Sequence, residues 1–178
     1  AVKAGRPWVL DPVAGGGLPF RTELAKELLQ SKPTMVRGNA SEILALGGGL
    51  ATGRGVDSTQ GVAAAADAAR AIAEQTGGAV LVTGEVDLII AAGCKEAIRC
   101  SNGTPLLTRV TGVGCAQGAL CAALCASCEG DWKTAAVTAT LLVCLAGEIA
   151  EGVSKRPGSF QIAYLDALDE VDAAVMMR

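Results

Sequence analysis

The segment Gly112–Cys115, with the sequence Gly-Val-Gly-Cys, combines residue types that suit anion chemistry. It runs directly into an apolar, small-residue stretch that predicts a helix as far as about Ser127. A glycine turn before a helix leaves backbone N–H groups unpaired, and the helix dipole adds positive potential there. Because Gly112 and Gly114 carry no side chains, an anion can approach these N–H groups closely. The segment would therefore suit a phosphoryl group in transfer, since the rate of that transfer depends mostly on positioning and charge stabilisation.

Cys115 falls in the first turn of that expected helix, where the helix dipole favours a thiolate. The thiolate could accept the proton of a substrate hydroxyl, or the side chain could simply position that hydroxyl. By itself, a short glycine motif of this kind is more often an ordinary loop beside a small buried thiol. The motif therefore needs support from the rest of the chain.

Three further polar motifs follow apolar runs that we interpret as strands, and they lie around Asp11, at Arg37–Glu42 and at Thr83–Glu85. Ligands of parallel α/β sheets bind at the carboxyl ends of the strands. Each motif also has a plainer interpretation. Asp11 can be a turn residue before Pro12, Thr83 an ordinary β-branched strand residue, and Glu42 the partner of Asn39 in a capping box.

Strands and helices alternate along the chain, which predicts a single α/β domain over residues 1–178 with a mainly parallel sheet. An antiparallel pair at 88–91 and 97–100 is expected within it. The Asn102-Gly103 turn predicts a further strand near 106–110. The strands are expected at 8–10, 34–36, 79–83, 88–91, 97–100 and 106–110. The first three helices are expected at 20–30, from residue 39 onward, and from 58 or 59 to 75. The last three are expected from about 115 to 127, from a cap at Asp131 to about 151, and from a cap at Ser159 onward.

Composition narrows the function classes. The net charge of −3 argues against a nucleic-acid partner, which needs a basic face. Seven cysteines with no histidine indicate free thiols in a reducing compartment. A zinc site at Cys125 and Cys128 lacks two further ligands.

We recognise no signal peptide, and the apolar stretch Ala135–Ala146 is shorter than the roughly 20 residues that span a bilayer. These features predict a soluble cytoplasmic protein without membrane contact.

The segment Val110–Cys115 resembles the anion-hole motif of the hydroxyethylthiazole kinase family. Most other ribokinase-like kinases carry Asp at the position of Cys115, so the cysteine is diagnostic. Six further blocks resemble that family's blocks in the same order, which is far more specific than any one motif. They are Asp11–Val13, Pro19–Thr22, Arg37–Ile43, Gly55–Ser58, Val82–Asp87 and Gly158–Phe160.

The resemblance implies a three-layer ribokinase-like domain that phosphorylates the hydroxyethyl group of 4-methyl-5-(2-hydroxyethyl)thiazole in thiamine salvage, with ATP as co-substrate and Mg2+. It implies a homotrimer with active sites at the subunit interfaces. It also implies a set of site residues: Cys115 near the attacking hydroxyl, Gly112 and Gly114 around the phosphate, Gly112 also at the substrate, Arg37 and Thr83 at ATP, and Asp11 and Glu42 at the metal.

The chain departs from the family pattern at Ala14, where Gly is frequent, and at Val113, where Thr is frequent. It also corresponds to the C-terminal two-thirds of the family's domain. We therefore expect it to expose a sheet edge or face that other elements would cover. Two alternatives remain: another ribokinase-like vitamin or sugar kinase, or a truncated, non-catalytic nucleotide-binding subunit.

Overall fold

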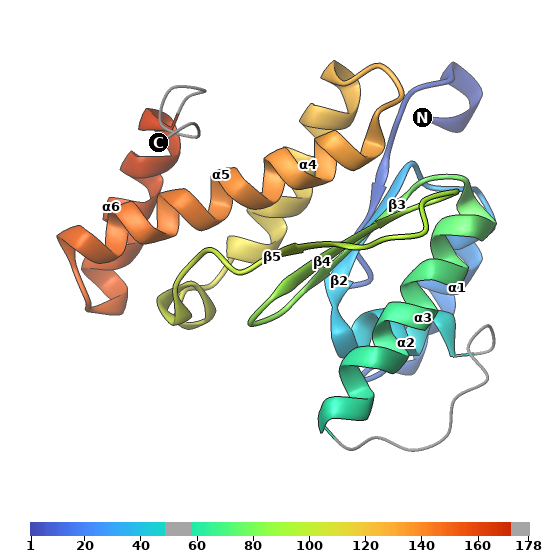
Figure 1. Cartoon of the computed structure of the whole chain (residues 1–178), viewed down its shortest axis with the longest axis horizontal. Helices are drawn as coiled ribbons and strands as arrows, with labels where there is room; N and C mark the ends of the chain where they lie inside the picture. Colours follow the sequence, from blue (N-terminus) through green and yellow to red (C-terminus); the bar gives the residue numbers. More distant parts are fainter. Residues whose placement is uncertain (49–57, 172–178) are drawn as a thin grey trace.

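The computed structural model describes residues 1–48 and 58–171 (Figure 1). The block Gly55–Ser58 lies partly outside the described residues, whereas the expected helix start at 58 is confirmed, because α3 begins at Ser58. After a short 3-10 helix, η1 (Val2–Ala4), five strands form one sheet in chain order. The strands are β1 (Val9–Leu10), β2 (Met35–Asn39), β3 (Ala79–Thr83), β4 (Asp87–Ala91) and β5 (Ile98–Cys100).

The sheet is mixed. β1, β2 and β3 are parallel, and β4 and β5 continue the sheet as antiparallel strands. The α/β class is confirmed, and so is the antiparallel pair expected at 88–91 and 97–100. All of β3 except Thr83 is buried, because helices cover both faces of the sheet.

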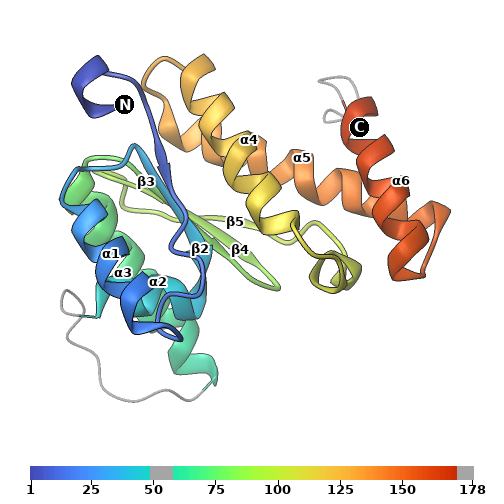
Figure 2. The ribbon, with the colours of Figure 1, turned by 180° about the vertical axis from the view of Figure 1, so that it is seen from behind.

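Helices form a layer on each face of the sheet (Figures 1 and 2). One layer holds α1 (Pro19–Leu29), α2 (Ala40–Gly47) and α3 (Ser58–Thr76), and the other holds α4 (Val113–Ser127) and α5 (Trp132–Val153), with α6 (Pro157–Glu170) against α5. Alternate strand residues serve the two cores. Val80 packs into the core shared with α3, whereas Leu81 packs into the core shared with α4 and α5. Two layers of helices on one sheet are the three layers that the resemblance predicted.

Two local predictions were wrong. Residues 106–110 do not form a strand, since Pro105–Arg109 is a 3-10 helix, η2, in which the Leu106 N–H donates to the hydroxyl of the N-cap Thr104 at 3.3 Å. Proline fixes φ in the helical range and suits the first position of a helix. The same preference starts α6 at Pro157, with Arg156 as its N-cap, so Ser159 lies inside the first turn and is not the cap.

α5 is longer than the apolar stretch Ala135–Ala146 suggested. Its 22 residues are long and apolar enough to cross a membrane, by length and composition alone. The helix packs between α4 and α6 and over the sheet, and nine of its residues are buried. This packing is typical of the central helix of a globular core.

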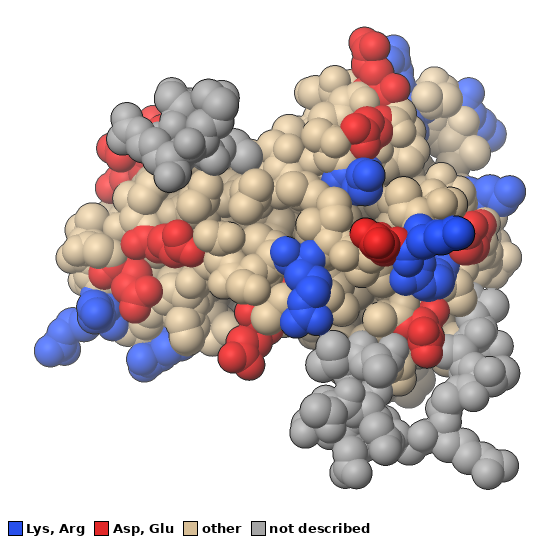
Figure 3. All heavy atoms as spheres, viewed as in Figure 1, with Lys and Arg blue, Asp and Glu red and all other residues tan. Residues whose placement is uncertain are grey.

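An apolar stripe on α1 remains exposed. Phe20, Leu24 and Leu28 are spaced by four residues, and the side chain of Phe20 is 80% exposed. β1 is the first strand of the sheet and pairs only with β2 among the described residues. An exposed sheet edge or sheet face was expected from the sequence, and the structure shows β1 at one edge of the sheet. The charges on the visible surface are of both signs, and they are scattered rather than gathered into one field (Figure 3).

Candidate active site

The sheet topology gathers the polar motifs at one edge. β1, β2 and β3 are parallel, so Asp11, Arg37–Asn39 and Thr83 all lie at or just beyond their carboxyl ends. β4 runs in the opposite direction, and therefore its first residue, Asp87, joins them there. The register pairs Asn39 with Thr83 and Asp87 with Cys100.

A cavity of about 740 Å³ opens at this edge, between the strand ends and the helical layer of α4 and α5. One wall is polar and comes from the strand ends, and the opposite wall is apolar and comes from η2, α4 and α5. A volume of this size matches small-molecule sites. The cavity lining includes the polar residues Arg37, Asn39, Thr83, Asp87 and Gln117, the apolar residues Leu107, Val110, Val113 and Val143, and Gly114.

Arg37 is the centre of the polar wall. Its Nε donates a hydrogen bond to Oε1 of Gln117 at 3.1 Å. Its Nη1 lies 3.4 Å from Oδ2 of Asp11, and its Nη2 lies 3.4 Å from the hydroxyl oxygen of Thr83. The side chain is 14% exposed and that of Asp11 is 18% exposed, so this ion pair is largely shielded from water. The structure thus joins the predicted residues Asp11, Arg37 and Thr83 through one guanidinium.

The guanidinium also lies against the start of α4. Gly112 is the N-cap of that helix, with φ of 97°, a backbone conformation that favours glycine. A Cβ at Gly114 would stand 2.7 Å from Nη1 of Arg37, so only glycine leaves room for this packing. Backbone N–H groups of the first turn and the Arg37 cation therefore converge on the same region, which suits a phosphate.

Asp11 and Glu42 are the two carboxylates expected to serve a metal. Oδ1 of Asp11 is buried and has no hydrogen-bond partner among the described residues. Burial raises the pKa of Asp11, and the Arg37 cation partly opposes that rise. Glu42 accepts hydrogen bonds from the backbone N–H groups of Ala14 at 3.0 Å and Asn39 at 2.9 Å. The second bond completes the predicted capping box with Asn39.

These two carboxylates fit Mg2+ as part of a site. The described residues contain no group of three or more Cys, Asp or Glu side chains arranged around a metal. Mg2+ is commonly held by one or two carboxylates, with waters and substrate phosphates completing its octahedron. The unpartnered Oδ1 of Asp11 is a free ligand of the required kind.

Not every predicted residue lines the cavity. Arg37, Thr83 and Gly114 do, whereas Asp11, Glu42, Gly112 and Cys115 lie outside its wall. Cys115 is exposed in the first turn of α4, three residues after the N-cap. The other cysteines are also free thiols, and burial raises the pKa of Cys121 to about 12 and that of Cys125 to about 11.

The sequence interpretation missed several residues of the site. Asp87 was not predicted as a site residue, but it is buried and accepts hydrogen bonds from the Gly84 N–H at 2.8 Å and the Cys144 thiol at 3.8 Å. Desolvation raises its pKa. Its place at the first position of a strand that begins four residues after Thr83 was the available signal.

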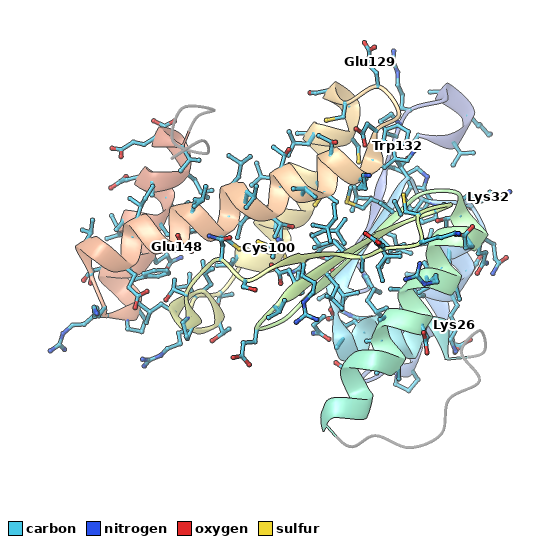
Figure 4. All side chains as sticks on the ribbon, in the orientation of Figure 1. Lys26, Lys32, Cys100, Glu129, Trp132 and Glu148 are labelled. Atoms are coloured by element: carbon cyan, nitrogen blue, oxygen red, sulfur yellow. The ribbon has the colours of Figure 1, made fainter. Side chains whose placement is uncertain are left out.

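Gln117 and Glu148 were missed because their partners are far away in sequence. Oε1 of Glu148, on α5, accepts hydrogen bonds from the Gly103 N–H at 2.7 Å and the Asn102 amide at 3.3 Å. The pair of contacts ties the loop after β5 to α5, next to Cys100 (Figure 4). That loop forms one side of the cavity.

Comparison with solved structures identifies the fold class. The structure of Bacillus subtilis pyridoxal kinase in an ADP complex is 22% identical, with a TM-score of 0.58 over 78% of this chain and 52% of that chain. A hydroxyethylthiazole kinase from Pyrococcus horikoshii OT3 is more similar, with 30% identity and a TM-score of 0.81 over 98% of this chain and 64% of that chain. Together the two structures show that the fold of this chain is ribokinase-like.

The family model "Hydroxyethylthiazole kinase family" matches residues 1–174. A hydroxyethylthiazole kinase of Kineococcus radiotolerans is 53% identical over 97% of this chain and 62% of its own length. One of Tolumonas auensis is 48% identical over 99% of this chain and 66% of its own length. The chain therefore belongs to the hydroxyethylthiazole kinase family, and it spans about two thirds of the length of these relatives.

Proposed function

We propose that this chain carries the nucleotide-binding and catalytic part of a kinase that transfers the γ-phosphoryl group of ATP to the hydroxyethyl group of 4-methyl-5-(2-hydroxyethyl)thiazole, in thiamine salvage. The observation that carries the proposal is the packing of Arg37 against Gly114. It brings a cation and the N-terminus of α4 together at the wall of a ligand-sized cavity. The family of the chain supports this substrate.

Different residues of the chain have different roles in the transfer. The substrate hydroxyl oxygen forms a bond to the γ-phosphorus, the bond from that phosphorus to the β,γ-bridging oxygen breaks, and ADP leaves. The backbone N–H groups at Gly112–Gly114 stabilise the charge on the transferring group. The Cys115 thiolate accepts the hydroxyl proton, or the thiol orients the hydroxyl. Its exposed position leaves it open to a substrate bound outside the cavity wall.

Arg37 and Thr83 bind the nucleotide phosphates in this proposal, and the apolar wall at Leu107, Val113 and Val143 takes the base. Asp11 and Glu42 would hold Mg2+ together with water, and the ion would neutralise charge on the phosphates. Asp11 has the free, buried oxygen for this role, whereas each Glu42 oxygen already accepts one backbone N–H, which favours a contact through water.

The decisive experiment measures ADP formation by the purified chain with ATP, Mg2+ and the thiazole alcohol. We expect turnover that requires the thiazole. An Arg37→Met variant should lose ATP affinity, because the side chain keeps its length but loses its charge. ATP hydrolysis independent of any alcohol, or equal rates with sugar or pyridoxal substrates, would contradict the substrate.

A nucleotide-binding subunit without catalysis is the second candidate. It is favoured by the position of Cys115 outside the cavity wall. ATP binding without turnover, restored by a second polypeptide, would support it. Another vitamin or sugar kinase is a weaker candidate, because Cys115 stands where Asp is expected. A Cys115→Asp variant compared on thiazole and pyrimidine alcohols separates these two substrate classes.

We also propose a homotrimer in the cytoplasm, with active sites between subunits and without nucleic-acid or membrane partners. The exposed stripe of Phe20, Leu24 and Leu28 supports burial against another polypeptide surface. The free cysteines suit a reducing compartment. Light scattering coupled to size-exclusion chromatography tests the assembly, and a mass equal to one chain would contradict it.

A further inference from the structure

Gln117 is a buried polar residue that faces the candidate site. It lies on α4, one helical turn after Val113, and the residue is only 3% exposed. It also lines the cavity. A buried amide needs a hydrogen-bond partner, and Oε1 accepts from Nε of Arg37 at 3.1 Å. Because Nε–H of arginine can only donate, the amide oxygen must face it.

The contact with Gln117 is the shortest of three side-chain contacts that hold the guanidinium. The contacts to Asp11 and Thr83 are both 3.4 Å long, near the outer limit for hydrogen bonds. The three acceptors come from α4, from the residue after β1 and from the end of β3. A guanidinium is planar, so contacts at Nε and at both terminal nitrogens fix its plane as well as its position.

The chemical character of Gln117 differs from that of Asp11. A neutral amide holds the arginine without neutralising its charge, whereas a carboxylate competes for that charge. Without the amide acceptor, the guanidinium would be free to turn toward Asp11 and form a closer, two-point ion pair. Such a pair would occupy N–H groups that a phosphate needs.

We infer that Gln117 is a positioning residue that fixes the Arg37 guanidinium against Gly114 and keeps its charge available to an anion in the cavity. The inference rests on the proposed function, because the anion is taken to be nucleotide phosphate. The amide acts through Arg37 and is not itself assigned a contact with the reacting atoms. Gln117 lies two residues after Cys115. The start of α4 therefore contributes both the N–H groups expected to bind phosphate and the acceptor that holds Arg37.

The test compares Gln117→Met with the wild-type chain by calorimetric titration of ATP and, separately, of adenosine. Methionine keeps the length and volume of glutamine but lacks the strong acceptor. We expect ATP affinity to fall about tenfold, the size of one lost hydrogen bond to a charged group, while adenosine affinity stays the same. An equal loss for both ligands would indicate a general packing defect and overturn the inference.

Two additional measurements separate positioning from structure. In an Arg37→Met background, Gln117→Met should cause no further loss of ATP affinity, because the residue acts only through Arg37. In nuclear magnetic resonance spectra, the Arg37 Nε–H should exchange faster with water in Gln117→Met and remain protected in Gln117→Glu, which keeps an acceptor oxygen. Unchanged exchange in Gln117→Met would overturn the inference.

The outcomes also separate this inference from the proposed function. If wild-type protein binds ATP and Gln117→Met binds it equally well, only the positioning role is overturned. If the wild-type chain binds no ATP, both the proposed function and the phosphate role of Arg37 are overturned. Selective loss of ATP affinity in Gln117→Met, absent in the Arg37→Met background, supports both.

Discussion

Nη1 of Arg37 stands within 2.7 Å of the place that a Cβ at Gly114 would occupy. Gly114 lies in the first turn of α4, and it has no positive φ that would itself require glycine. The glycine is therefore needed for the approach of the arginine and not for the shape of the backbone. This relationship connects β2 to the N-terminus of α4 and underlies the first prediction.

Gly114→Ala should displace the guanidinium and weaken ATP binding by about tenfold, on the scale of one charge-assisted hydrogen bond. The fold should remain intact, because alanine is a better helix former than glycine. Calorimetric titration with ATP measures the first effect and thermal unfolding the second. The matched control is Gly152→Ala in α5, where a Cβ would meet no atom within 4 Å. Unchanged ATP affinity in Gly114→Ala would contradict the role given to Arg37.

Cys115→Ala tests the proton acceptor. Since the thiol is exposed, its removal should leave the free energy of unfolding nearly unchanged. We expect kcat to fall by roughly 100-fold if the thiolate accepts the proton, and by much less if it only orients the hydroxyl. Steady-state kinetics with saturating ATP and varied thiazole gives the answer. The matched control is Cys94→Ala, because Cys94 is a partly buried thiol away from the site. Cys121→Ala is unsuitable, because that thiol is buried in the core and its removal would affect stability.

Asp87 should make folding stability fall as pH rises. Its pKa in the folded protein is raised above the ordinary 3.8, chiefly by burial, so the folded state binds the proton more tightly than the unfolded state. The free energy of unfolding is then highest below pH 3.8 as far as this group is concerned, and it falls between 3.8 and the raised pKa. Asp87→Asn, which still accepts from the Gly84 N–H, should remove that slope.

Urea unfolding at a series of pH values from about 3.5 to 7 measures the slope for Asp87. Asp131→Asn serves as the opposite case. Hydrogen bonds from Thr134 lower the pKa of Asp131. The contribution of Asp131 to the free energy of unfolding is therefore present above pH 3.8 and is lost as pH falls below that value. A slope that is the same in wild-type protein and Asp87→Asn would show that Asp87 is not desolvated.

Asn39 should stabilise the fold through its capping box. Its side chain accepts from the Glu42 N–H at 3.0 Å, and its own N–H donates to the Glu42 carboxylate. Asn39→Ala should lower the free energy of unfolding by about 1 kcal/mol, whereas Asn39→Ser should retain most of the stability. Chemical denaturation of the three proteins provides the comparison. Equal losses in both variants would mean that the amide contributes through the cavity wall and not as a cap.

Ala14 has a φ of 61°, in the left-handed region that alanine disfavours. Ala14→Gly should therefore raise the free energy of unfolding, by an amount on the order of 0.5 kcal/mol after the greater flexibility of glycine in the unfolded chain is subtracted. Thermal unfolding detects the shift. A lower melting temperature would show that the methyl group contributes more through contacts than it costs in backbone strain.

The amino-acid sequence by itself determined the elements and the family. Periodicity predicted most helices and strands, because apolar spacing reports which faces are buried. Asn39 and Glu42 predicted their own capping box, since both partners lie within one helical turn. The Val110–Cys115 motif and the ordered blocks indicated the family. Two predictions failed where a proline, Pro105 or Pro157, decided the local backbone more strongly than the surrounding pattern.

Only the tertiary structure decided what Arg37 contacts. Its partners Asp11, Thr83 and Gln117 lie 26, 46 and 80 residues away in sequence, so no local spacing connects them. Asp87 likewise reaches the site only because β4 runs antiparallel to β3 and places its first residue at the carboxyl ends of the parallel strands. Burial and charge pairing depend on which strands lie side by side, and that arrangement follows from packing the whole sheet between its two layers of helices.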